Sequence, residues 1–179
     1  NGKQRWCLWL EGEKLQDLYD IPAIAKRLER VKESRAASSK SATQVQADTP
    51  HLFSEVRQPK LGSYLLIPTV SSERRRYIPI GFFDAKDVVV APNFIVPNAT
   101  PFEFGILTSE MHNDWMRAVA GRLESRYRYS ATLVYNTFPW PEASDQQRKK
   151  IEELAEEVLL VREDYPEKSL SKLYDPKEM

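Results

Sequence analysis

The sequence has a single cysteine, Cys7, only two histidines, and no apolar run long enough to cross a membrane. One cysteine excludes a disulfide framework or a thiolate metal cluster within the chain, and a reducing cytoplasm is the expected compartment. His51 and His112 lie far apart without a second ligand at helical spacing, so no metal site is predicted. A membrane span needs roughly 18 apolar residues, and the layout of a signal peptide is also absent. No membrane partner is expected.

Motifs for catalysis are missing as well. The chain has no Gly-rich phosphate loop and no Asp/Asn-Pro-Pro-aromatic tetrapeptide of the kind that grips an extruded adenine. Ser71 and Ser72 have no nearby histidine to activate a hydroxyl group. Around Asp48, Glu55 and Lys60 the carboxylate-x-lysine spacing of a metal nuclease is absent. We therefore predict no catalytic, cofactor-binding or metal-binding residue in this chain.

The length and charge of the chain describe an ordinary globular protein. Its 179 residues suffice for one domain with a core plus a helical appendage. The 26 basic and 26 acidic residues balance, but they are segregated along the sequence. Residues 24–40 are mostly basic, whereas the tail after Lys150 is rich in Glu and Asp. The start at Asn1 without Met, and the end at Met179, are expected of a piece of a longer protein.

The first third of the chain predicts a strand, a helix and a linker. Residues 5–10 form an apolar run typical of a short buried strand. A helix is predicted to open near Asp20 and to carry a basic outer face. Its apolar positions, at helical spacing, are Ile24, Leu28 and Val31. Residues 34–49 lack an apolar period and indicate a fraying helix followed by a linker, so we expect a boundary near Thr49 and Pro50.

The middle of the chain is predicted to be a β-sheet. Residues 63–70, 76–83 and 87–96 are rich in Tyr, Ile, Val and Phe and are bounded by turn residues. Three prolines interrupt these runs and cannot donate to a ladder: Pro68, Pro79 and Pro92. We expect an irregular, strongly twisted sheet whose strands lie at edges or carry bulges.

Helices and one further strand are predicted towards the C-terminus. Ser109 can cap a helix with Trp115, Met116 and Val119 on its buried side, and residues 129–135 resemble a strand. Ser144 and Gln147 have capping-box spacing ahead of a last helix. Its apolar stripe, expected to pack on another long helix, is Ile151, Leu154, Val158 and Val161. The predicted fold class is α+β, a twisted mixed or antiparallel sheet with packed helices, flanked by N-terminal and C-terminal helices.

A row of charged residues near position 125 is the strongest functional signal. Glu124, Arg126 and Arg128 alternate, so on an extended strand all three would point the same way. In a DNA major groove, Glu can accept from the cytosine amino group and Arg can donate a pair of hydrogen bonds to guanine. From composition alone, a surface ion pair at the end of a helix is the simpler interpretation.

Three consecutive arginines form the second signal. Arg74, Arg75 and Arg76 join two predicted strands, so a hairpin tip would project three guanidinium groups that could straddle phosphates. A solubilising loop explains them equally well.

Four longer stretches carry a resemblance to a known family. They are residues 5–10, 64–81, 104–109 and 128–141. Together they resemble the C-terminal part of the MmeI-like adenine DNA methyltransferases, the single-chain restriction-modification enzymes of type IIL and their methylase-only relatives. In that family a methyltransferase domain binds S-adenosylmethionine and flips the target adenine, and a following target recognition domain reads neighbouring bases.

The resemblance implies a division of the chain and a set of DNA contacts. Residues 1–49 would be a helical connector after a methyltransferase domain, residues 50–141 the target recognition domain, and residues 142–179 a C-terminal helical segment. The paired base-reading positions of the family fall on Glu124 and Arg126, with Arg128 next, and a second region includes Asn93. Contacts to the DNA backbone are expected from Arg74, Arg75, Arg76, Lys26 and Arg30.

The resemblance shifts the balance for Glu124 and its neighbours towards base contact. The implied partners are double-stranded DNA and an intramolecular methyltransferase domain, and the implied cofactor of the parent protein is S-adenosylmethionine, with none in this chain. The alternative is a protein-interaction module that docks another subunit through the C-terminal stripe and reads no DNA.

Overall fold

The computed structural model describes residues 5–177, which form two compact units. One unit ends at Val56 and is helical; the other begins at Arg57 and contains both sheets, and we call it the mixed unit. The units divide beyond the expected boundary at Thr49 and Pro50. No helix of the described residues is both long and apolar enough to span a membrane.

The helical unit contains four short elements. They are α1 (Leu15–Tyr19), α2 (Pro22–Ala36), α3 (Ser41–Val45) and a 3-10 turn (Gln46–Asp48). Helix α2 begins with Pro at its first position and buries Leu28, as its apolar spacing predicts. The guanidinium of Arg35, near its C-terminus, donates to the carbonyls of Gln46, Thr49 and Leu52. These bonds fold back a segment that the sequence predicts to be a fraying helix and linker.

The predicted strand at residues 5–10 is wrong. These residues form no regular element, and the side chain of Trp6 is 93% exposed. Trp9 instead stacks on Phe53, with ring centroids 5.5 Å apart, and Cys7 is exposed. The apolar run has no strand partner within the described residues, so its hydrophobicity alone does not make it a strand.

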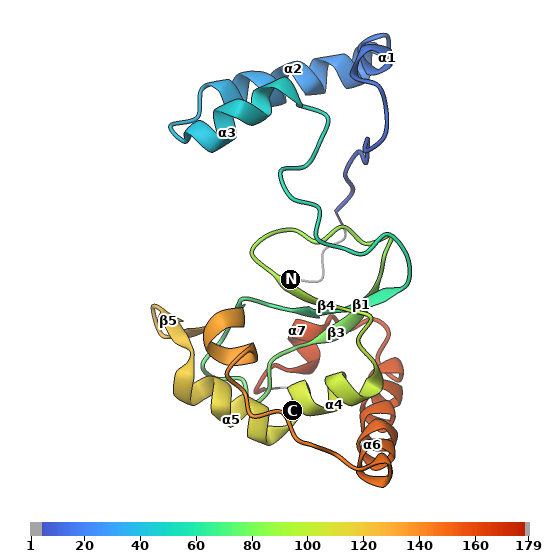
Figure 1. Ribbon diagram of the computed structural model, residues 1–179, viewed down its shortest axis with the longest axis vertical. Coiled ribbons are helices and arrows are strands. Elements are labelled where there is room, and N and C mark those ends of the chain that lie inside the picture. Colours follow the sequence, from blue (N-terminus) through green and yellow to red (C-terminus); the bar gives the residue numbers. More distant parts are fainter. Residues whose placement is uncertain (1–4, 178–179) are drawn as a thin grey trace. The chain divides into compact units, whose positions relative to one another are not determined.

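The mixed unit has two three-stranded antiparallel sheets. The strands of the first sheet lie side by side in Figure 1. The first has the order β3-β1-β4 and the second the order β2-β6-β5. Their strands are β1 (Ser63–Ile67), β2 (Val70–Ser71), β3 (Gly81–Asp84), β4 (Phe94–Pro97), β5 (Gly121–Leu123) and β6 (Arg126–Arg128). The strands are shorter than predicted, and Pro68, Pro79 and Pro92 lie between them. The predicted α+β class and its antiparallel sheet are confirmed.

Five helices accompany the sheets. They are α4 (Pro101–Thr108), α5 (Glu110–Val119), a π-helix (Ala131–Tyr135), α6 (Asp145–Glu163) and α7 (Leu170–Leu173). The caps predicted for α5 and α6 are confirmed: Ser109 accepts from the amide of His112, and Ser144 with Gln147 forms a capping box. Helix α4 has a capping box of its own, Thr100 with Glu103, which the sequence analysis missed. The predicted strand at 129–135 is wrong, because Ala131–Tyr135 is helical.

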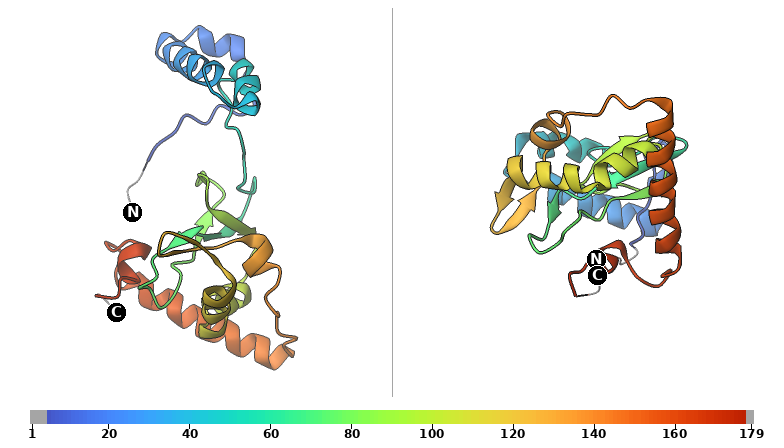
Figure 2. Two further views of the ribbon diagram at one scale, coloured as in Figure 1. Left: turned by 90° about the vertical axis from the view of Figure 1, so that its left-hand side faces the viewer. Right: turned by 90° about the horizontal axis from the view of Figure 1, so that it is seen from below.

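Helix α6 packs against α4 (Figure 2). The contact includes a glycine of α4, Gly105. A Cβ atom at Gly105 would lie 2.8 Å from Cγ2 of Ile151 and 3.3 Å from Cβ of Ala155. Ala155 is buried in this contact, whereas Leu154, Val158 and Val161 are 41–58% exposed. Within residues 5–177 the predicted stripe therefore only partly faces a helix, and that helix is the short α4.

The core lies between the first sheet and helices α4 and α5. Its fully buried members include Leu65, Ile67, Ile80, Phe104, Leu107 and Val134. Two polar side chains of α5 are buried with them. Asn113 accepts from the amide of Ile78 at 2.9 Å, and Nε2 of His112 lies 3.0 Å from the hydroxyl of Tyr129. His112 is therefore a structural side chain of the core.

The close contact at Gly105 gives a stability prediction. Gly105→Val should lower the free energy of unfolding by about 1–3 kcal/mol, because the branched side chain would overpack the contact with Ile151. Gly121→Val is the matched control, because no atom lies within 4 Å of a Cβ built there. Urea unfolding measures both. Equal stability of the two variants would contradict the packing described for α4 and α6.

Burial of His112 gives a pH prediction. Desolvation lowers the pKa of His112 to about 4, so this side chain is neutral in the folded state. Between its unfolded pKa, about 6.5, and pH 4 the unfolded chain binds the extra proton. Stability should therefore fall by roughly 3 kcal/mol as the pH drops through this window, and no such loss should occur above it. Urea unfolding between pH 7 and 4.5 should show this slope in the wild type and a flatter one in His112→Gln.

Candidate functional site

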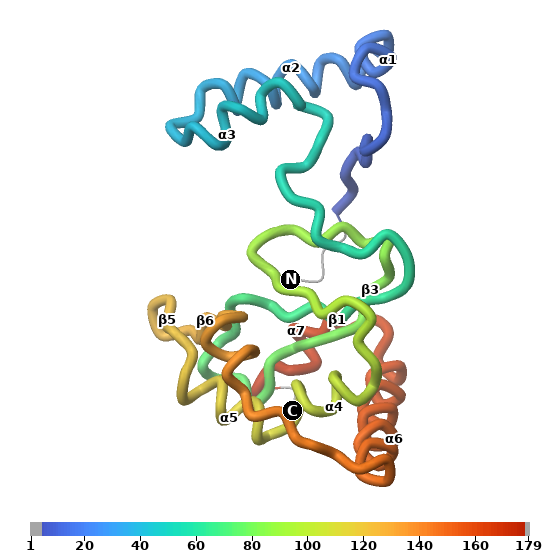
Figure 3. Tube along the Cα trace, viewed as in Figure 1, coloured from blue at the N-terminus to red at the C-terminus, as the bar shows by residue number. Residues whose placement is uncertain are grey.

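Strands β5 and β6 form a hairpin on the side of the mixed unit away from α6 (Figure 3). Leu123 pairs with Arg126, and Glu124 and Ser125 make the turn between them. Glu124 has φ of 57°, a left-handed conformation uncommon outside glycine. Arg126 and Arg128 share one strand, but Glu124 does not, so the expectation of three residues in a row on one extended strand is wrong. Glu124 nevertheless lies at the same tip, where its Oε2 accepts from Nη2 of Arg126 at 2.7 Å.

Two tyrosines fix the direction of the hairpin arginines. Tyr127 and Tyr129 are 9% and 3% exposed and belong to the core. Since neighbouring side chains of a strand point to opposite faces, Arg126 and Arg128 point to solvent. Burial raises the pKa of Tyr129 well above its ordinary value. The phenol therefore stays neutral, and it contacts His112.

Arg122 also belongs to the hairpin, although the sequence analysis did not single it out. Its guanidinium carbon lies 3.7 Å from the centre of the Tyr127 ring, and Nη1 donates to the carbonyl of Ser125 at 3.0 Å. These contacts join the first strand of the hairpin to its turn. The alternation of Arg and Tyr in the sequence begins only at Arg126, and Arg122 contacts Tyr127 because the two residues are cross-strand partners.

Strand β2 lies beside this hairpin and leads into the loop that contains Arg74, Arg75 and Arg76, which we call the arginine-rich loop. Ser71 pairs with Tyr127 and Val70 with Arg128, and the amide of Tyr129 donates to the carbonyl of Thr69 at 2.7 Å. The loop that leaves β2 at Ser72 is therefore held beside the hairpin turn. It is not a hairpin tip as predicted, because β2 pairs with β6 and the chain continues to β3 in the other sheet.

The three arginines of this loop have different surroundings. Arg74 has a side chain 80% exposed, with its Nε 3.9 Å from the carboxylate of Glu73. Arg75 is partly buried, and its Nη2 donates to the carbonyl of Ser171 at 3.2 Å. Arg76 pairs with Glu110 at 2.7 Å, and this hydrogen bond raises the pKa of Arg76. Of the three, Arg74 is the one most available to a ligand.

A polar cleft of about 750 Å³ lies where these segments meet. Its residues come from the loop after β2, the hairpin turn and the segment after α7. They are Ser72, Glu73, Arg74, Arg75, Glu124, Ser125, Arg126, Asp175, Pro176 and Lys177. The fold therefore brings together two groups of residues that the sequence analysis treated separately, the arginine cluster and the Glu/Arg pair.

The remaining predicted contacts lie elsewhere. Asn93 precedes β4 and does not line the polar cleft. Its side chain donates to the carbonyl of Val90 at 2.9 Å. Lys26 and Arg30 are exposed on α2 of the helical unit. No group of three His, Cys, Asp or Glu side chains suited to a metal ion occurs within residues 5–177.

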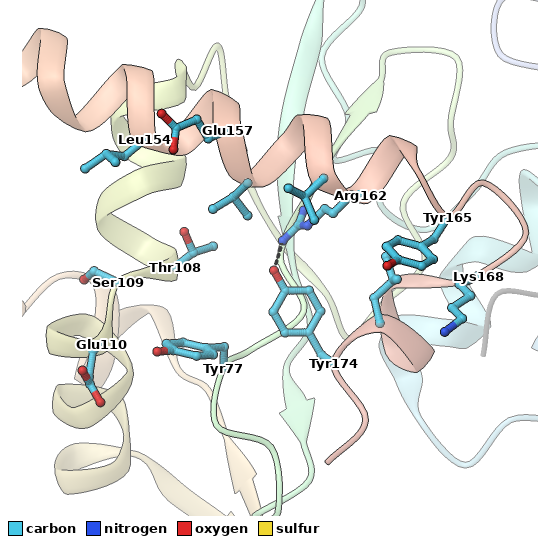
Figure 4. Close-up of a pocket in the computed structure, with 13 residues that line it drawn as sticks. Tyr77, Thr108, Ser109, Glu110, Leu154, Glu157, Arg162, Tyr165, Lys168 and Tyr174 are labelled. Atoms are coloured by element: carbon cyan, nitrogen blue, oxygen red, sulfur yellow. Dashed lines mark hydrogen bonds between the residues drawn. The ribbon is translucent and has the colours of Figure 1, made fainter. Parts of the chain in front are cut away.

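A second cleft, about 720 Å³, is an apolar groove along α6 (Figure 4). Leu154, Val158 and Val161 of the predicted stripe line it, opposite Tyr77 and Tyr174. Within this groove Arg162 donates to the Tyr174 hydroxyl, between Glu157 on one side and Tyr165 on the other.

Comparison with known proteins gives one consistent family. The sequence model described as "MmeI, target recognition domain" matches residues 1–142, and "MmeI, C-terminal domain" matches residues 143–179. DNA methyltransferase A of Bacillus subtilis (strain 168) is 40% identical over all 179 residues, which span 20% of that protein. The solved structure of the type IIL restriction-modification enzyme MmeI in complex with DNA superposes with a TM-score of 0.92. It is 49% identical, and the match covers 97% of this chain and 23% of that one.

The chain thus spans about a fifth of the length of these two proteins. The two sequence models together match residues 1–179, and the superposition covers 97% of the chain. The chain belongs to the MmeI family, whose target recognition domain and C-terminal domain its residues match.

Proposed function

We propose that this chain recognises a DNA sequence and positions the methyltransferase domain of a longer protein on it. The observation that carries the proposal is the hairpin turn. There an acceptor, Glu124, and a donor, Arg126, are exposed side by side with Arg128 next to them on β6. Membership of a family whose member MmeI has been solved with DNA supports the same function.

The chemistry of the pair suits a C·G base pair. Arginine can donate two hydrogen bonds to O6 and N7 of guanine, and a glutamate can accept from N4 of cytosine. The 2.7 Å ion pair holds Glu124 and Arg126 at a spacing that could serve adjoining partners of one base pair. Each such contact is typically worth about 1–3 kcal/mol of discrimination between bases. Arg128 and Asn93 are proposed as further base contacts.

Contacts to phosphate would set the register of the domain on DNA. Arg74 is well placed for this, because it is exposed at the rim of the same cleft. Arg75 and Arg76 would add positive charge while holding the loop through Ser171 and Glu110. Lys26 and Arg30, exposed on α2 of the helical unit, are proposed as further phosphate contacts. Such contacts release counterions, so binding should weaken steeply with salt.

The proposed mechanism is positional, and the chain is proposed to have no catalysis of its own. Phosphate contacts set the register and base contacts select the site. A methyltransferase domain of the same longer protein would then extrude an adenine and methylate it with S-adenosylmethionine. Docking of another subunit in the apolar groove along α6 is the competing function. It leaves the exposed Glu124 and Arg126 without a role, so DNA reading is preferred.

Two measurements test the proposal directly. The chain is mixed with a randomised pool of DNA duplexes and the bound fraction is sequenced, and its DNA affinity is then measured by fluorescence anisotropy over a salt series. DNA affinity that falls with salt, together with an enriched motif in the bound fraction, is the expected result. Binding that is insensitive to salt, or absent at low salt, would favour the docking function instead.

The Glu124 and Arg126 pair gives a prediction about specificity. The double variant Glu124→Lys with Arg126→Asp reverses the pair but preserves its attraction, so the hairpin should stay folded. The preferred base pair at one position of the enriched motif should change, because donor and acceptor exchange places. The matched control is Lys150→Glu with Glu153→Lys, which reverses an exposed pair on α6. An unchanged motif in the first variant would remove this pair from base reading.

A further inference from the structure

The cleft beside the hairpin has a third side that comes from the end of the chain. Asp175, Pro176 and Lys177 line it together with the loop after β2 and the hairpin turn. The first two sides belong to the part of the chain that matches the target recognition domain, and the third to the part that matches the C-terminal domain. The surface proposed to meet DNA is therefore built from both.

Several contacts hold this third side in place. Arg75 of the loop donates to the carbonyl of Ser171. Arg162 of α6 donates to the carbonyl of Ile80 at 2.9 Å and also to the hydroxyl of Tyr174. Its guanidinium lies 5.0 Å from the centre of the Tyr174 ring. The segment is thus tied to the arginine-rich loop on one side and to α6 on the other.

A second glycine allows the segment to approach β3. A Cβ atom at Gly81 would lie 2.6 Å from Cδ1 of Leu170, so α7 packs where a larger residue would displace it. Beyond α7, the amide of Lys177 donates to the side chain of Asp175 at 3.0 Å, which closes a turn around Pro176. This turn sets the backbone of Lys177 at the cleft.

The charges of the cleft favour an anionic contact at Lys177. Four basic residues face three acidic ones there, but Glu124 is paired with Arg126 and Asp175 is engaged in its turn. Lys177 is exposed, and among the described residues that line the cleft it is the one lysine. An ammonium group on a flexible side chain at such an edge suits a phosphate oxygen rather than the fixed geometry of a base edge.

We propose that the segment Asp175–Lys177 is part of the DNA-binding surface and that Lys177 contacts a backbone phosphate next to the bases read by the hairpin. The proposal rests on the DNA-reading function proposed above. It adds that the C-terminal domain contributes directly to DNA affinity, while the hairpin retains the choice of bases.

The test compares two lysines of the same segment in the whole 179-residue chain. Lys177→Gln removes the charge at the cleft, and Lys172→Gln removes another exposed charge, on α7, that lines neither cleft. Affinity for the enriched duplex is measured by anisotropy from low to high salt. Lys177→Gln should lower the slope of log K against log salt by about 0.9 and weaken binding roughly five- to tenfold near ~0.1 M salt. Lys172→Gln should match the wild type, and Lys177→Arg should retain the slope.

The outcomes separate this inference from the proposed function. If the wild type binds and Lys177→Gln has the same slope, or if both glutamine variants lose the same affinity, the phosphate contact is overturned while DNA reading stands. A changed motif in Lys177→Gln would also overturn it, because a phosphate contact carries no base information. Failure of the wild type to bind DNA at low salt would overturn both proposals together.

Discussion

The burial of Tyr127 and Tyr129 is the constraint on which the rest of the surface depends. Once these two rings enter the core, the alternation of the strand obliges Arg126 and Arg128 to face outward. The backbone of the same strand pairs with β2, which brings the arginine-rich loop beside the hairpin turn. The outward direction of Arg126 and Arg128 and the position of the arginine-rich loop beside the hairpin turn thus both follow from β6, whose place is fixed by the packing of the tyrosines.

Similar residues within one run acquire different roles from partners far away in the chain. Arg74, Arg75 and Arg76 are consecutive, yet one is exposed, one is bound to the carbonyl of Ser171 and one is paired with Glu110. The three arginines of this loop are therefore not equally available to contact a phosphate. Two of the guanidinium groups shape the loop, because their hydrogen bonds link it to the C-terminal segment and to α5, and the third is presented by that shape.

Sequence patterns correctly predicted the structural features that depend on residues close together in the chain. The caps of α5 and α6 and the apolar spacing of α2 depend on residues a few positions apart, and these predictions were correct. The strand expected at residues 5–10 and the single row through Glu124 were wrong, because strand formation and turns depend on distant pairing partners. The cleft could not be predicted at all, since three segments separated by many residues build it.

The left-handed backbone at Glu124 restricts how this hairpin could be re-targeted. Asparagine, aspartate and glycine adopt such a conformation most readily, straight-chain residues do so at modest cost, and β-branched residues are strongly disfavoured. Fewer residue types can therefore occupy position 124 than position 126, because Arg126 lies on ordinary extended backbone. Diversification of recognition in this fold should be asymmetric, with the strand position varying freely and the turn position drawing on a short set of residues.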